Sequence, residues 1–127
     1  MPRGAMSDRR TVSEVPHAAT VRLPEAMAVH DAAQLAAMHT LEAVVVLDAN
    51  GEVRGAVLAS VLMRLADRVP AAPLRLVPLL TCLSVPADAK VAQTLDAMTR
   101  VGASAALVHH DRGDPVLVTQ ERLLSVA

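Results

Sequence analysis

Few side chains in this sequence are of the types that catalyse reactions or bind metals, and the densest group of them is His109-His110-Asp111. Adjacent residues of a strand point to opposite faces of a sheet, so two neighbouring histidines chelate a metal ion poorly. No third ligand is evident near them in the sequence, and a metal site needs several converging donors. We therefore interpret the group as the shoulder of a hairpin and expect no metal site.

The other reactive residue types are isolated from one another. Cys82 is the single cysteine, which excludes an internal disulfide and a zinc site built from several cysteines. It lies in an apolar stretch, so we interpret it as a small buried hydrophobic residue and not as a nucleophile. Asp48 and Asp111 are typical turn residues and do not form a paired acid and base. The sequence thus contains no catalytic constellation, and we expect the protein not to be an enzyme.

Composition narrows the classes of partner. The chain has 127 residues, with 12 basic and 13 acidic side chains, and it contains no aromatic Phe, Tyr or Trp. A balanced charge argues against nucleic-acid binding, and without aromatic rings no base can be stacked. The opening MPRGAMSDRR lacks an apolar signal core, and the uncharged stretch 76–87 is too short to cross a membrane. We expect a cytoplasmic protein, and the excess of arginine over lysine together with abundant alanine hints at a bacterial source.

The elements that must position any site follow from an internal repeat. The segments AAQLAAMHTLEAVVVLDANGEVRGAV and AQTLDAMTRVGASAALVHHDRGDPVLV align with Met38 and Met98, which are 60 positions apart. Each segment follows a strand broken by proline, TVRLPEA or TCLSVPADA, and precedes a Leu-rich amphipathic stretch. Apolar spacing places Met38 and Met98 on core faces of helices. The sequence therefore predicts an α+β fold of two tandem β-α-β-β-α units.

The expected elements have the following bounds. Asn50-Gly51 is a strong hairpin signal, and Arg112-Gly113-Asp114 plays the same part less clearly. We expect strands at 18–23, 44–47, 53–57 and 80–85, and helices at 29–38, 60–68, 90–100 and 120–125. The domain boundaries expected from these elements are a flexible tail at 1–13, a first unit at 14–69, a linker at 70–75 and a second unit at 76–127.

Two units of this kind resemble a CBS-domain pair, the module named after cystathionine β-synthase. The segments that carry the resemblance are SVPADAKVAQTLDAMTRVGASAALVHHDRGDPVLVTQERLL in the second half and VVVLDANGEVRGAVLASVLM, with Gly55, in the first half. The resemblance implies two units packed through their sheets. It also implies clefts between the units that bind an adenosyl ligand such as AMP, ATP or S-adenosylmethionine.

The sequence departs from the family's motif, in which a glycine precedes a threonine and an aspartate that hold phosphate and ribose. In the first half, Leu58 and Val61 stand where the family has threonine and aspartate. In the second half Thr119 is kept, but Arg122 replaces the aspartate and Val116 the glycine. An arginine cannot accept hydrogen bonds from ribose hydroxyls, although it binds phosphate well. An arginine here would either bind a phosphate or fill the cleft.

Two functions remain open on this evidence. In the first, the chain is a stand-alone regulatory module that senses an adenosyl ligand and requires no cofactor. In the second, it is a degenerate pair that binds no nucleotide and acts as a dimeric interaction or scaffold protein. For the first function, the expected ligand-binding residues are Thr119, Arg122, Thr20, Val21, Leu23, Ala43 and Val44.

We also expect a homodimer, and a regulatory role implies a regulated protein, of unknown identity, as a second partner. The helices Ser60–Arg68 and Gln120–Val126 carry Leu-rich surfaces, and in the family such helices often join two chains. We place Leu62 on this face, so that a charge at Leu62 is expected to yield a monomer.

Overall fold

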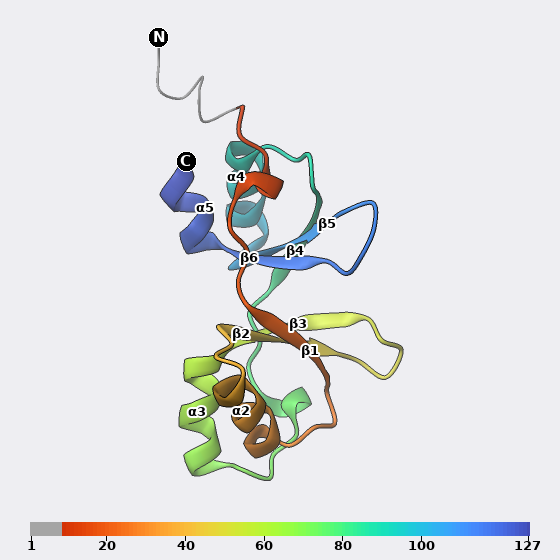
Figure 1. Cartoon of the computed structure of the whole chain (residues 1–127), viewed down its shortest axis with the longest axis vertical. Helices are drawn as coiled ribbons and strands as arrows, with labels where there is room; N and C mark the ends of the chain where they lie inside the picture. Colours follow the sequence, from red (N-terminus) through yellow and green to blue (C-terminus); the bar gives the residue numbers. More distant parts are fainter. Residues whose placement is uncertain (1–8) are drawn as a thin grey trace. The chain divides into compact units, whose positions relative to one another are not determined.

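The computed structural model describes residues 9–127, which form two compact units (Figure 1). Unit I is the continuous segment Ala19–Leu80. Unit II combines residues 9–18 with the segment Thr81–Ala127. Each unit contains one three-stranded sheet with helices, so the expected α+β fold with two tandem units is confirmed.

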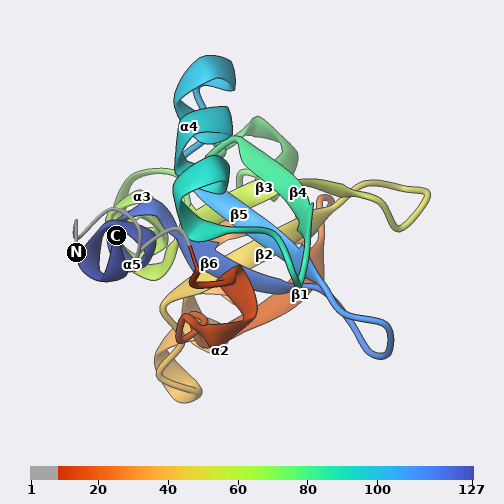
Figure 2. The same cartoon turned by 90° about the horizontal axis from the view of Figure 1, so that it is seen from above.

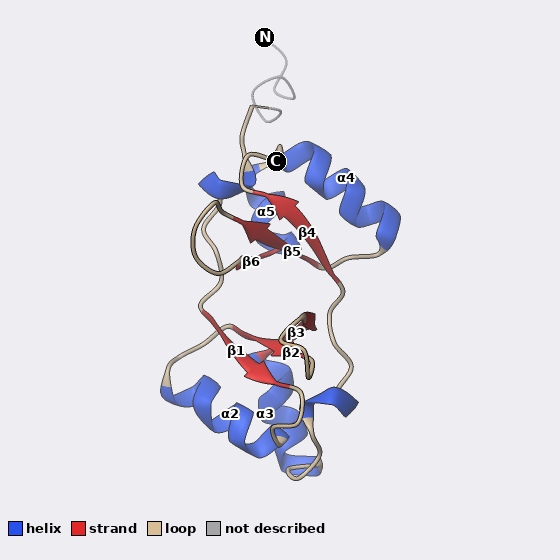
Figure 3. Ribbon diagram, turned by 90° about the vertical axis from the view of Figure 1, so that its right-hand side faces the viewer, coloured by secondary structure: helices blue, strands red, loops and turns tan. Residues whose placement is uncertain are grey.

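Unit I follows the predicted order of elements. These are β1 (Thr20–Pro24), α2 (Val29–Met38), β2 (Ala43–Leu47), β3 (Val53–Leu58) and α3 (Ala59–Arg68). The strand order is β1-β2-β3, with β1 parallel and β3 antiparallel to β2. Helices α2 and α3 lie on the same face of this sheet (Figure 3). Strand β2 is buried over four successive residues, as its continuous aliphatic run predicts.

Unit II repeats this topology. Its elements are β4 (Cys82–Pro86), α4 (Val91–Val101), β5 (Ala105–His109), β6 (Val116–Thr119) and α5 (Gln120–Val126). The strand order is β4-β5-β6, again with one parallel and one antiparallel pair. Helices α4 and α5 lie on the same face of the sheet, as the views in Figures 1 and 2 agree. Helix α4 ends at Val101 and is capped by Gly102, whose φ of 72° is favourable for glycine.

The first hairpin turns where the Asn50-Gly51 signal predicts. The Asp48 carboxylate accepts hydrogen bonds from the backbone N–H groups of Asn50, at 2.8 Å, and Glu52, at 3.0 Å. Gly51 has a φ of 79°, which side chains other than glycine rarely adopt. The Asp48 side chain thus fixes the turn locally.

From the straps to strands β2 and β5 the two units match at a spacing of 62 residues, and after the hairpins at 61, whereas the sequence alignment suggested 60. Helix α2 begins at Val29 and α4 at Val91, 62 positions later. The equivalent of Met98 is therefore Ala36, and both are buried in their cores. Met38 instead corresponds to Arg100 and is 74% exposed, so its predicted place on a core face was wrong. The two methionines share a residue type but not a helical phase.

Each unit contains a short segment that, in the sequence, directly precedes the first strand of the other unit. We call residues 71–80 strap I, in unit I, and residues 9–18 strap II, in unit II. Strap I contains a 3-10 turn at Leu74–Leu76, and strap II contains one at Val12–Glu14, again 62 residues apart. Val12 and Leu74 are buried at these equivalent positions.

Matching backbone hydrogen bonds attach the two straps. The Leu74 N–H donates to the Met27 carbonyl at 2.9 Å, and the Val12 N–H donates to the Ala89 carbonyl at 2.9 Å. A reciprocal bond enters each strap, from Val29 N–H to the Ala72 carbonyl and from Val91 N–H to the Arg10 carbonyl. Each strap thereby satisfies an N–H at the start of a helix and covers a hydrophobic core.

The division of the chain therefore differs from the expected boundaries. Residues 14–18 belong to unit II and not to the first unit, and 76–80 belong to unit I and not to the second. The expected linker 70–75 contains a core residue, Leu74, and residues 9–13 of the expected tail contain another, Val12. Residues 1–8 of that tail lie outside the described part. The place of the straps in the two units escaped prediction because neither strap has a clear apolar periodicity and their hydrogen-bond partners are distant in sequence.

Candidate ligand-binding residues

Thr119 lies where strand β6 passes into helix α5. It pairs with Ala105 in the sheet and forms the N-cap of α5. Its hydroxyl oxygen accepts a hydrogen bond from the backbone N–H of Arg122 at 3.4 Å. Thr119 is half-buried, and its hydroxyl stabilises the start of the helix.

Arg122 lies one turn into α5 and reaches strap II. Its Nη1 donates to the backbone carbonyl of Pro16 at 3.4 Å and to that of His17 at 3.3 Å. The guanidinium group therefore joins the closing helix of unit II to the last residues of its strap. Thr119 and Arg122 are neighbours because they are three residues apart at the start of one helix.

The remaining five expected residues lie together in unit I. In the parallel ladder, Thr20 pairs with Ala43 and Val21 pairs with Val44. The side chains of Ala43, Val44 and the nearby Leu23 are buried, so these residues offer only backbone groups to a ligand. Strand β1 is at the edge of its sheet, where part of the backbone is not used in strand pairing.

Unit I lacks the polar pair that unit II has. Leu58 pairs with Ala43 as Thr119 pairs with Ala105, and Leu58 is the N-cap of α3 as Thr119 is of α5. Leu58 provides no side-chain hydrogen bond to its helix. Val61, the equivalent of Arg122, provides no donor either. The register of the two sheets thus supports the sequence comparison of these positions, and only unit II has a hydroxyl and a cation there.

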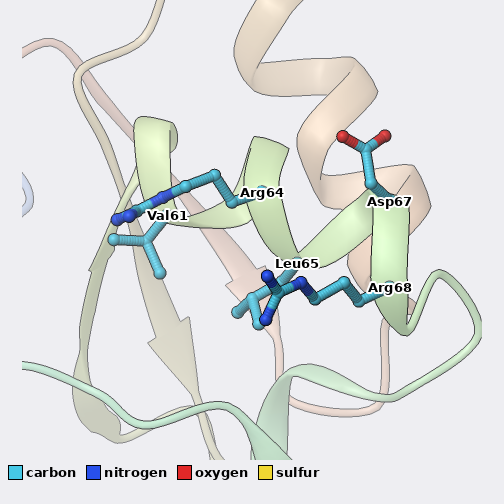
Figure 4. A pocket seen from close by; sticks show the side chains of 5 residues that line it. All are labelled: Val61, Arg64, Leu65, Asp67 and Arg68. Carbon is cyan, nitrogen blue, oxygen red and sulfur yellow. The ribbon is translucent and has the colours of Figure 1, made fainter.

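A hollow of about 420 Å³ lies along α3 (Figure 4). Figure 4 shows the side chains of Val61, Arg64, Leu65 and Arg68 extending along one side of the helix, while the Asp67 carboxylate points elsewhere. Within residues 9–127, neither Arg64 nor Arg68 forms an ion pair. In the sequence analysis both arginines fall within the expected contact helix, Ser60–Arg68. In the sequence, the hollow corresponds to two pairs of residues that are each four positions apart, Val61 with Leu65 and Arg64 with Arg68. Residues at this spacing lie on the same side of a helix.

The isolated reactive residues are placed as follows. His109 ends β5, and His110 and Asp111 follow it in an exposed loop. In the described part of the chain, no three His, Cys, Asp or Glu side chains gather closely enough to hold a metal ion. Cys82 is half-buried, and burial raises the pKa of its thiol from 9.0 to about 11. The thiol is therefore protonated at neutral pH, which makes it a poor nucleophile.

Comparison with known proteins gives a consistent class of fold. No family model and no curated protein matches the sequence. Among solved structures, a hemolysin-like protein containing a CBS domain from Oenococcus oeni is 17% identical, with a TM-score of 0.74 over 97% of this chain and 93% of that one. The CBS domain of a membrane protein from Sphaerobacter thermophilus is 20% identical, with a TM-score of 0.69 over 98% and 94% of the two chains.

A third solved structure contains a ligand. It is the CBS domain of a bacterial CNNM/CorC family Mg²⁺ transporter in complex with ATP, which is 16% identical, with a TM-score of 0.70 over 96% of this chain and 89% of that one. These likenesses cover nearly the whole chain, and the fold is that of CBS-domain proteins. None of the helices described in residues 9–127 has the length and apolar character needed to cross a membrane.

Proposed function

We propose that this chain is a regulatory CBS module of the cytoplasm, without catalytic activity, that binds an adenosyl ligand through its phosphate groups. The observation that carries the proposal is the polar pair of unit II, in which Thr119 and Arg122 are three residues apart at the β6–α5 junction. The ATP complex of the similar CNNM/CorC domain supports a nucleotide as the ligand class.

The chemistry of the pair favours phosphate over ribose. Arginine offers donors that match phosphate oxygens, and a threonine hydroxyl can donate to one more. No carboxylate replaces the family's aspartate at position 122, so ribose hydroxyls lose their acceptor there. We therefore propose ATP or AMP before S-adenosylmethionine. The backbone of Thr20, Val21, Leu23, Ala43 and Val44 stays a proposed ligand contact of unit I.

Regulation requires that the ligand distinguish two states of the module. A ligand shifts an equilibrium only by the difference between its affinities for the two states. Because cellular adenine nucleotides are abundant, an affinity between micromolar and millimolar is enough, equivalent to about −8 to −4 kcal/mol.

Calorimetric and thermal-shift titrations with ATP, AMP, S-adenosylmethionine and adenosine test this function. At 100 times its dissociation constant, ATP is expected to stabilise the protein by about 2.7 kcal/mol. Arg122→Gln is expected to weaken ATP binding at least about tenfold and to leave adenosine unchanged, because a charged hydrogen bond contributes about 1.5–3 kcal/mol. Arg112→Gln, in the exposed loop between β5 and β6, is the control. Flat titrations, or equal losses for ATP and adenosine, would reject the function.

A dimeric interaction or scaffold protein is the second candidate, and unit I favours it. Leu58 and Val61 leave that unit without polar ligand groups. Outside the cores, Met63 on α3 and Leu124 on α5 are exposed hydrophobic side chains. We propose that α3 and α5 join two copies of the chain. Leu62 is not part of that face, since it is fully buried in the core of unit I, and a charge there would unfold the unit.

A further inference from the structure

Strap II is held to unit II by apolar anchors and by a few hydrogen bonds. Val12, Val15 and Ala18 are buried. The Ala18 N–H donates to the Leu117 carbonyl at 2.8 Å, next to the carbonyls of Pro16 and His17 that accept from Arg122. The C-terminal end of strap II therefore depends on one side chain of α5 as well as on its own backbone.

Strap I is fastened differently at the equivalent place. There Leu80 corresponds to Ala18, and two backbone hydrogen bonds join it to Ala56, at 2.7 and 3.3 Å. The residue equivalent to Arg122 is Val61, which has no donor. In the described hydrogen bonds of unit II, Ala18 has one bond to Leu117, and the guanidinium supplies the further attachment.

The two tasks of the Arg122 guanidinium compete with each other. When it faces the strap, Nη1 serves two carbonyl oxygens, which carry partial negative charge and repel an anion. When it binds a phosphate in bidentate fashion, two of its N–H groups must point at the phosphate oxygens. A charged partner is the stronger acceptor, so a bound phosphate draws the guanidinium from the carbonyls.

We propose that Arg122 is a latch, a positioning residue that holds strap II in the ligand-free protein and releases it when a ligand phosphate is bound. The release step rests on the proposed function, whereas the holding step does not. Thermodynamic reciprocity then requires that any change that loosens strap II also alters the affinity for the phosphate ligand.

Hydrogen exchange of the full chain, measured by mass spectrometry, tests the latch. The reporters are backbone amides of strap II, chiefly those of Val12 and Ala18, which donate to Ala89 and Leu117. Without ligand, Arg122→Gln is expected to speed their exchange about 3- to 10-fold, the effect of losing about one hydrogen bond. Arg122→Lys keeps a donor and is expected to restore part of the protection. Amides of strap I should not change, and Arg112→Gln serves as the matched control.

The ligand arm uses ATP and adenosine at concentrations where calorimetry shows each to be bound. ATP is expected to raise exchange in strap II, and adenosine, which has no phosphate, is expected to leave it unchanged. If ATP binds and exchange in strap II stays the same or falls, the latch is overturned while the proposed function stands. If ATP does not bind, the proposed function and the release step fail together. Unchanged exchange in ligand-free Arg122→Gln overturns the holding step by itself.

Discussion

At the scale of single residues, the structure separates positions that look equivalent in the sequence. Met38 and Met98 stand at the same place in two similar strings of letters, but only Met98 faces a core. The helix that contains Met38 buries Val29, Ala32, Ala33 and Ala36, a spacing that leaves Met38 on the opposite side. Burial follows helical phase, so residue type alone was a poor guide.

Replacement of the two methionines is expected to affect the stability of the protein very differently. Met98→Ala removes a fully buried side chain from unit II and is expected to lower the free energy of unfolding by about 2–4 kcal/mol, because it leaves a cavity. Met38→Ala, at a 74% exposed position, is expected to change it by less than about 0.5 kcal/mol. Urea denaturation followed by circular dichroism measures both. Equal effects would contradict the 62-residue register.

The candidate site could be predicted only within each motif. Thr119 and Arg122 are three residues apart, so their proximity follows from the start of a helix. The contact of Arg122 with Pro16 and His17 joins residues more than 100 positions apart, and no local sequence pattern predicts it. Sequence reasoning offered phosphate binding or a filled cleft for this arginine, and did not include a bond to the chain's own backbone.

At the scale of elements, helices and strands were predictable and straps were not. Helix α2 has the predicted bounds, Val29–Met38, and the other elements whose bounds were predicted differ by at most about two residues, since apolar periodicity and the Asn50-Gly51 turn are local signals. Strap II contains single apolar residues among polar residues and a proline, whereas strap I is mostly apolar and is interrupted by two prolines. Their burial comes from long-range packing, which neither spacing nor propensity encodes.

A pair of substitutions in strap II distinguishes a core segment from a tail. Val12→Asp places a charge in the core of unit II and is expected to lower the free energy of unfolding by more than about 3 kcal/mol, since a buried unpaired charge is costly. Ser13→Asp, at the exposed neighbouring position, is expected to have an effect below about 0.5 kcal/mol. Urea unfolding is the measurement. If both variants are as stable as the wild type, residues 9–18 are not an integral part of unit II.

At the scale of the whole molecule, the proposed homodimer can be tested with two equally exposed side chains. Leu124 on α5 and Val101 at the end of α4 are each 58% exposed. Because Leu124 lies on a proposed contact helix, Leu124→Glu is expected to shift the mass in solution to that of a monomer. Val101→Glu adds the same charge elsewhere and is expected to leave a dimer. Sedimentation equilibrium measures the masses.

Two results would reject this interface. If Leu124→Glu remains a dimer, α5 does not join the copies. If the wild-type protein is itself a monomer at concentrations well above micromolar, the proposed assembly fails altogether. Neither substitution is expected to unfold the chain, since both side chains are largely outside the cores, and circular dichroism checks that point.

The exchange of straps between units also sets an order of events during synthesis on the ribosome. Unit I is complete in the chain once Leu80 has emerged, because all of its parts lie between Ala19 and Leu80. Strap II emerges earlier than any other described segment, yet the core that it covers ends only with α5. At about 5–20 residues per second, Val12 and Val15 must wait several seconds for their partners. During this interval the nascent chain has a complete unit I, while Val12 and Val15 are exposed to solvent and accessible to a chaperone.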